Sequence, residues 1–238
     1  MKKIASLIIV LILLSSCQED VQFNNPGFQA YRDGVLFRGI DVKAFKSANG
    51  KITLQALAQD EELSLDVSNS TVGTYFLGTT NTNNLATYSS SFNDVILEYA
   101  TVVVSGPVAK IATPLISGGS TYVTGTGIAT TGGSGSGLTV KTTVNASGTI
   151  TEVKISSPGI NYLSGDIITI TGGNNTAKFR VLNVEGSNGE ITITENDGAT
   201  ISGVFKFNAI INNGNSEANE LVNFQYGEFY KVPIFPAP

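Results

Sequence analysis

The chain has 238 residues, with 14 basic and 19 acidic side chains, a formal net charge of -5 and no histidine. The lack of histidine excludes Ser-His-Asp and Cys-His hydrolases and every histidine-containing metal site. A single cysteine excludes an intramolecular disulfide, and the acidic balance argues against a nucleic-acid partner, which would be held through its phosphates.

The first 16 residues have the layout of a signal peptide, because Lys2 and Lys3 precede an apolar run from Ile4 to Leu14. That run is too short to cross a bilayer core of about 30 Å as a helix. Leu14-Ser15-Ser16-Cys17 resembles the lipobox of bacterial lipoproteins. The resemblance implies cleavage before Cys17, a diacylglycerol on its thiol and an acyl chain such as palmitate on the new amino terminus. We therefore expect lipidation at Cys17 and an anchor that does not span the membrane.

Residues 17–27 are expected to form an acidic and polar tether. Gln18 stands where an aspartate favours inner-membrane retention in some bacterial lipoproteins, so outer-membrane sorting is expected. Gln18-Glu19-Asp20 resembles the surface-export signal of Bacteroidota-type lipoproteins, although a solvated linker explains the same residues. Loss of Lys2 and Lys3 leaves 12 basic residues against 19 acidic ones. Such a body avoids an anionic lipid surface, so the tether must hold it there.

Residues 28–106 and 185–238 read as a discontinuous all-β body. Asp33-Gly34 and Asn49-Gly50 lie between alternating apolar segments, which predicts hairpins with type I′ turns. Asp60-Glu61-Glu62 is expected to separate strands at 52–58 and 63–67, and later strands are expected at 190–194, 200–209 and 221–232. Short, evenly spaced strands predict an antiparallel meander that forms a sandwich or a small barrel.

Residues 107–184 are predicted to be an inserted β-repeat domain, because this segment is rich in Gly, Ser and Thr and holds few acids. Residues 119–144 match 159–184 at an offset of 40 without a gap, including a Tyr-x-x-Gly and a Thr-Gly-Gly. One copy of such a unit cannot bury a core, so the two copies should pack on each other. The identical residues of the first copy are Gly119, Tyr122, Gly125, Ile128, Thr131, Gly132, Gly133 and Val144.

Two resemblances follow from these patterns. The insert resembles Gly-rich β repeats of phage and virus structural proteins through Gly133–Gly137, Ser157–Tyr162 and Gly165–Ile170. The flanking body resembles a family of small Bacteroidota-type lipoproteins of unknown function. This resemblance implies the all-β fold and the outer-membrane location, and it implies no activity. That likeness rests on Phe28–Ala30, Gly73–Gly78, Ala86–Tyr88, Gly189–Glu195, Ile201–Phe207, Gly227–Phe229 and Val232–Ile234.

Several groups are candidate chemical sites, and each also has a plain structural explanation. Gly132–Gly137 lacks the Lys of a phosphate loop and is better explained as a turn. Asp60-Glu61-Glu62 offers oxygen ligands for Ca²⁺ but reads as a solvated loop tip. Asn24-Asn25, Asn81–Asn84 and Asn212–Asn215 are candidate glycan contacts or turn caps. Glu98, Glu190 and Glu195 are available for carboxylate chemistry. The candidates for a sugar-stacking platform are Tyr88, Tyr99, Tyr122, Tyr162, Tyr226 and Tyr230.

Three functions stay open on this basis. The first is an outer-membrane, cell-surface lipoprotein that binds or displays, is not an enzyme and needs no cofactor or metal. The second is a periplasm-facing carrier of a small apolar ligand inside a barrel, and the third is a hydrolase that uses carboxylates alone. The expected partners are the membrane, through Cys17, and a surface glycan or protein.

Overall fold

The computed structural model describes residues 26–92, 95–212 and 219–238. Within these ranges the chain forms 17 strands in two sheets and no helix, which confirms the predicted all-β class. No helix in the described part of the chain is long and apolar enough to cross a membrane. Residues 1–16, the tether up to residue 25 and Cys17 lie outside the described residues.

The larger sheet has eleven strands in the order β2-β1-β17-β3-β4-β5-β7-β8-β16-β15-β6. Its strands are β1 (Gly27–Arg32), β2 (Val35–Arg38), β3 (Asp41–Lys46), β4 (Ile52–Ala58), β5 (Glu61–Val67), β6 (Gly73–Leu77), β7 (Leu85–Phe92), β8 (Val95–Ala100), β15 (Asn188–Asn196), β16 (Thr200–Ile211) and β17 (Leu221–Pro236). A further pairing joins β17 to β16, so seven strands close into a barrel-like ring.

The strand order departs from simple succession at β1–β17, β17–β3, β5–β7, β8–β16 and β15–β6, and two of these departures concern β6 and the end of β17. β5 pairs with β7, whereas β6 lies at the far edge and pairs with β15. The last part of β17 runs parallel to β3, with Ile234 opposite Ala44. Both departures use strands that are distant in sequence, which local alternation does not reveal.

The turns follow the expected positions but not always the expected type. Asp33 and Gly34 have φ of 49° and 81°, as a type I′ turn requires. The type I′ prediction for Asn49-Gly50 is wrong, because only Gly50 has a positive φ, at 87°. The Ser47–Lys51 loop is longer, and the Gly50 N–H donates to the Ser47 carbonyl at 2.9 Å. Glu61 and Glu62 belong to β5 rather than to the preceding turn, which leaves Gln59 and Asp60 as the loop.

The interior of the larger sheet is filled by aromatic side chains. Phe207 stacks on Phe224 with ring centroids 4.7 Å apart, and Phe28 lies 5.1 Å from Phe205. The Phe229 ring stacks 6.4 Å from that of Phe28, so the rings form one connected series. These side chains are almost fully buried, and their burial stabilises the larger sheet through the hydrophobic effect.

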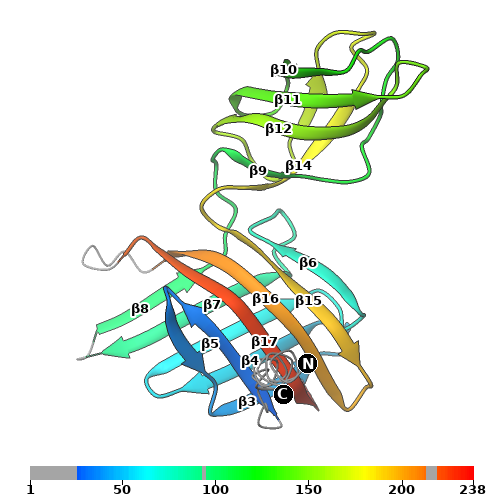
Figure 1. The fold of residues 1–238 in the computed structure, drawn as a ribbon. Coiled ribbons are helices and arrows are strands. Elements are labelled where there is room, and N and C mark those ends of the chain that lie inside the picture. The colour runs from blue at the N-terminus through cyan, green and yellow to red at the C-terminus, as the bar shows by residue number, and fades with distance from the viewer. Residues whose placement is uncertain (1–25, 93–94, 213–218) are drawn as a thin grey trace, which may run out of the picture.

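The smaller sheet has six strands in the order β12-β11-β10-β13-β14-β9 and a separate buried core. Its strands are β9 (Val108–Ile111), β10 (Gly125–Thr131), β11 (Ser136–Val144), β12 (Ile150–Ile160), β13 (Ile167–Ile170) and β14 (Lys178–Val184). Figure 1 shows this sheet standing beyond the larger one, joined to it by two neighbouring chain segments. The Glu185 N–H donates to the Pro107 carbonyl at 2.8 Å, so the chain leaves and returns side by side.

Two buried tyrosines organise the smaller sheet. A methyl group on Gly173 would lie 2.6 Å from the Tyr122 ring, and one on Gly135 would lie 2.5 Å from the Tyr162 ring. Each ring therefore occupies space that only a glycine leaves open. The Tyr122 hydroxyl also donates to the Ile170 carbonyl at 3.0 Å and accepts from the Ala177 N–H at 3.1 Å. The glycine richness of this segment is thus partly a packing requirement.

Candidate functional site

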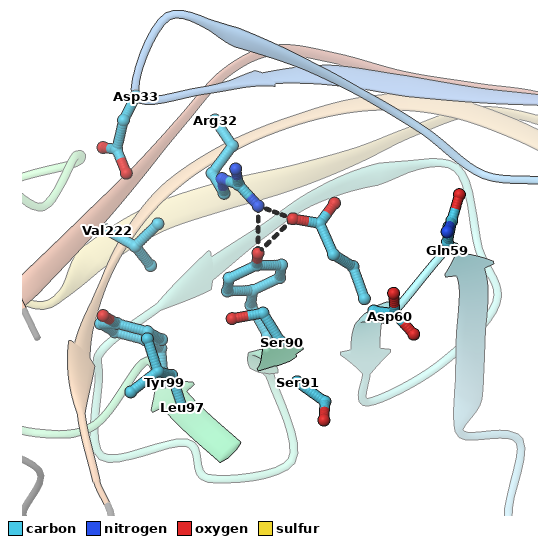
Figure 2. Close-up of a pocket in the computed structure, with 11 residues that line it drawn as sticks. Arg32, Asp33, Gln59, Asp60, Ser90, Ser91, Leu97, Tyr99 and Val222 are labelled. Carbon is cyan, nitrogen blue, oxygen red and sulfur yellow. Dashed lines mark hydrogen bonds and ion pairs between the residues drawn. The ribbon is translucent and has the colours of Figure 1, made fainter. Parts of the chain in front are cut away.

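Two surface hollows on the larger sheet hold the candidate chemistry. The first, the mouth pocket, is a hollow of about 460 Å³. Figure 2 shows its lining, to which the β1–β2 and β4–β5 turns, β7, β8 and the start of β17 contribute side chains. Those residues are Arg32, Asp33, Gln59, Asp60, Glu61, Tyr88, Ser90, Ser91, Leu97, Tyr99 and Val222.

The central charges of the mouth pocket are paired with each other. Arg32 forms an ion pair with Glu61 and donates to the Tyr88 hydroxyl. Tyr88 in turn donates to Glu61 Oε1 at 2.7 Å, as the dashed lines in Figure 2 show. The guanidinium, carboxylate and phenol satisfy one another, so these three groups stabilise the pocket wall and none of them is left free to bind a ligand.

Tyr99 forms the neighbouring wall of the mouth pocket. Its ring lies 6.0 Å from that of Tyr88, and its hydroxyl donates to the Asn219 carbonyl at 3.1 Å. Burial raises the pKa of the Tyr99 hydroxyl, and the nearby Asp33 carboxylate raises it further. The phenol is therefore a neutral hydrogen-bonding wall at physiological pH.

The second hollow, the outer hollow, lies over the solvent face of β15, β16 and β17 and encloses about 500 Å³. Its residues form two rows across the strands. In one row, Lys206 lies between Glu190 on one side and the bulge residues Gln225 and Tyr226 on the other. In the second row, Val204 lies between Thr192 and Glu228. Every strand beneath the hollow is paired on both sides, so a ligand there meets side chains and no free strand edge.

Tyr226 gives the outer hollow its most unusual feature. It sits in a bulge of β17, where the register against β16 shifts between Phe205 and Phe207. Its φ is 51°, the left-handed region that L-residues rarely adopt, and its side chain is 84% exposed. The ring meets that of Tyr31, itself 47% exposed, edge to face at 6.4 Å. A strained residue thus presents a large aromatic surface to solvent.

The two carboxylates of the outer hollow differ in their surroundings. Burial raises the pKa of Glu190, but hydrogen bonds and charge from Lys206 at 3.1 Å and Lys110 at 3.3 Å outweigh it, and the net pKa is lowered. Lys110 comes from β9, so the smaller sheet supplies one of the two cations that pair with Glu190. Glu228 has no cation beside it among the described residues, and burial raises its pKa.

The structure does not bring the six predicted tyrosines together. Tyr88 and Tyr99 line the mouth pocket, whereas Tyr122 and Tyr162 are buried in the smaller sheet. Tyr226 is exposed in the outer hollow and Tyr230 is half-buried further along β17. The prediction of one stacking platform formed by these six tyrosines is therefore wrong. Alternation along different strands places their rings on different faces and in different cores.

The predicted acids are also dispersed. Glu190 lies in the outer hollow, while Glu98 on β8 and Glu195 on β15 are exposed elsewhere. Of the acidic run, Asp60 and Glu61 line the mouth pocket, and Glu62 accepts from Gln55 at 2.7 Å. No group of three or more potential metal-binding side chains occurs within the described ranges.

The remaining polar candidates make hydrogen bonds within the fold where they are described. Asn84 is buried and accepts from the Ser68 N–H at 2.9 Å, and Asn212 donates its N–H to the Glu98 carbonyl at 2.8 Å. Asn24-Asn25 and residues 213–215 lie outside the described residues. In Gly132–Gly137, Ser134 hydrogen-bonds through its N–H to Asp166, which ties the turn to the other half of the sheet.

Sequence reasoning missed several residues that shape the two hollows. These are Arg32, Gln225, Lys206 and Glu228, together with Tyr31, which packs against Tyr226, and each stands in an ordinary alternating β pattern. Lys206 and Glu228 lie in segments that carry the family likeness, Ile201–Phe207 and Gly227–Phe229, but the likeness gives no indication of a hollow. Gly227, inside the strand pattern next to Tyr226, is the one local sign of the bulge.

Fold and site together define an all-β protein of two sheets with polar, aromatic-walled hollows on its surface. The family model described as domain of unknown function DUF6252 matches the chain over residues 24–126 and 120–233. The chain belongs to this family, and both matched segments supply strands to the eleven-stranded sheet. No curated protein and no solved structure matches the chain.

Proposed function

We propose that the protein is a lipid-anchored outer-membrane module, facing the cell surface, that binds a partner through the outer hollow and does not catalyse a reaction. The address rests on the signal-like residues 1–16, on the lipobox resemblance that ends at Cys17 and on the acidic run after it. The Bacteroidota-type lipoprotein resemblance supports the same address.

One observation carries the binding role: the outer hollow keeps its best recognition groups unused. Tyr226 is 84% exposed, and Glu228 has no ion-pair or hydrogen-bond partner among the described residues. By contrast, the mouth pocket satisfies its Arg32, Glu61 and Tyr88 groups internally. Ligand sites are recognised by such convergent free groups in a concavity.

The filled interior supports a surface binder over a carrier. Phe28, Phe207 and Phe224 are at most 2% exposed and occupy the space that an apolar ligand would need. Carboxylate hydrolysis receives less support, because Glu190 is held by two lysines rather than facing a second acid.

We infer that the smaller sheet arose as a duplicated unit that acts as a spacer or display element. Residues 40 positions apart share left-handed backbone: Gly132 and Gly172 have φ of 89° and 96°, and Thr121 and Asn161 have 60° and 61°. Thr130 also pairs with Ile170, its own counterpart, as expected for two copies related by a local two-fold axis. The resemblance to phage and virus repeats fits such a role.

The address is tested with a Cys17→Ser variant. No other cysteine exists to form the thioether, so the variant should leave the membrane fraction. Protease added to intact cells should cut the wild-type protein, whereas Glu19→Ala/Asp20→Ala should stay anchored and become protected. Sedimentation of Cys17→Ser with membranes after a high-salt wash would refute the anchor, and equal cleavage of both anchored forms would refute the export signal.

A further inference from the structure

Resting on the outer hollow as the binding surface, we propose that this hollow is a carbohydrate site, in which a neutral sugar ring stacks on Tyr226 and its hydroxyls bond to Glu228 and Gln225. A sugar ring has an apolar C–H face and polar edges. An exposed aromatic ring flanked by hydrogen-bonding groups matches both parts of that chemistry.

The aromatic geometry favours a ring-shaped ligand. Tyr226 and Tyr31 meet edge to face at 6.4 Å, so the two rings form a corner rather than a flat stack. Both are substantially exposed, and the bulge fixes the direction in which Tyr226 points. A rigid, preoriented ring contributes contact area with little loss of side-chain entropy on binding.

The polar groups around the corner suit hydroxyls. Glu228 lies between Gln29 of β1 and Val204 of β16, and its carboxylate is free to accept from a ligand. Gln225 offers both a donor and an acceptor beside Tyr226, and Thr192 adds a hydroxyl at the far side of the hollow. The hollow therefore offers both donors and acceptors to a ligand.

The charge balance favours a neutral ligand. Glu190 pairs with both Lys110 and Lys206, which leaves one positive charge in excess, and the unpaired Glu228 supplies one negative charge, so these four groups sum to zero. An anionic ligand would meet Glu228 directly, while a polycation would find only one free carboxylate. A peptide adding as a strand is disfavoured, because β16 and β17 are both paired on each side.

The test is gel retardation of the purified full chain, held in detergent, through gels containing starch, glucomannan, galactan or arabinoxylan, with polygalacturonate as an anionic comparison. At least one neutral polysaccharide should retard the wild-type chain. Tyr226→Ala should weaken that retention about tenfold, the loss expected for one stacked ring, while Tyr226→Phe should retain it. Val123→Ala, at a 76% exposed apolar residue of the smaller sheet, should behave as wild type.

Thermal unfolding of each variant shows that a loss of retention is not a loss of fold. The proposal is overturned if no neutral polysaccharide retards the chain, if only polygalacturonate does, or if folded Tyr226→Ala binds as well as wild type. Because the gel uses purified protein, it does not depend on the anchor or on surface exposure. If no retardation occurs but protease cuts the protein on intact cells, the carbohydrate proposal is wrong and the proposed surface location stands. If retardation occurs but protease does not cut the protein, the surface location is wrong and the carbohydrate proposal stands.

Discussion

Replacing Tyr226 should reveal the backbone strain at the outer hollow through a reversal of the usual ranking of glycine and alanine. At φ of 51°, any residue with a Cβ carries a left-handed penalty of roughly 1–2 kcal/mol, which glycine avoids. Glycine loses about 0.5–1 kcal/mol more than alanine to chain entropy on folding. Tyr226→Gly should therefore be more stable than Tyr226→Ala by about 0.5–1 kcal/mol.

Comparing these two variants removes the ring from both, so its contacts cancel. Urea unfolding followed by circular dichroism gives the free energies of unfolding of the two variants. In thermal unfolding, a chain of this size should show a difference of about 1–4 °C between their midpoint temperatures. The matched control is Val204, an exposed strand residue of the same hollow without a positive φ. There the glycine variant should be less stable than the alanine variant by about 0.5–1 kcal/mol.

If Tyr226→Gly proves less stable than Tyr226→Ala, as at an ordinary strand position, the bulge does not hold this residue in the left-handed region. The argument that strain orients the ring over the hollow would then fall. Reversal at both 226 and 204 would equally contradict the reasoning, because it would trace the effect to something other than the local φ.

Three further predictions concern the two cores and the free carboxylate. Tyr122→Phe should lower the free energy of unfolding in urea by about 1–3 kcal/mol, because it leaves the buried Ala177 N–H without its acceptor. Tyr162→Phe should change that free energy little, since the Tyr162 hydroxyl has no partner among the described residues. Equal losses in the two variants would contradict this account. Burial raises the pKa of Glu228, so the folded state holds this proton more tightly than the unfolded state does. The free energy of unfolding therefore falls as the pH rises from about 4.3, the ordinary glutamate pKa, through the raised pKa of Glu228. Glu228→Gln should accordingly exceed wild type in urea midpoint at pH 7 and lose that advantage below about pH 4, whereas an advantage that grows in acid would reverse the assigned sign. Replacing residues 107–184 by a short Gly-Ser link should leave a cooperative β transition, because Pro107 and Glu185 are hydrogen-bonded neighbours and the two buried cores share no residue; a chain without any thermal transition would show that the larger sheet depends on the smaller one.

Much of the fold follows from local sequence. Alternation of apolar and polar residues fixed the all-β class, and Asp33-Gly34 marked a hairpin whose two positive φ values match a type I′ turn. These features depend on neighbours along the chain, which the sequence displays directly. Asn49-Gly50 shows the limit, because the same kind of dipeptide closes a longer loop when the flanking strands pair in a different register.

Tertiary structure alone decided which side chains meet. The outer hollow joins Glu190, Lys206 and Tyr226 from three different strands, and Tyr31 of β1 packs against Tyr226. The pairing of β17 with β16 and β1 sets their order. The same pairing forces the bulge that turns Tyr226 outward, although a tyrosine has no local preference for that backbone. The sequence by itself determined most strands and several turns, because those depend on near neighbours. The site was decided by long-range register, because a one-residue shift between strands sends a side chain to the opposite face of the sheet.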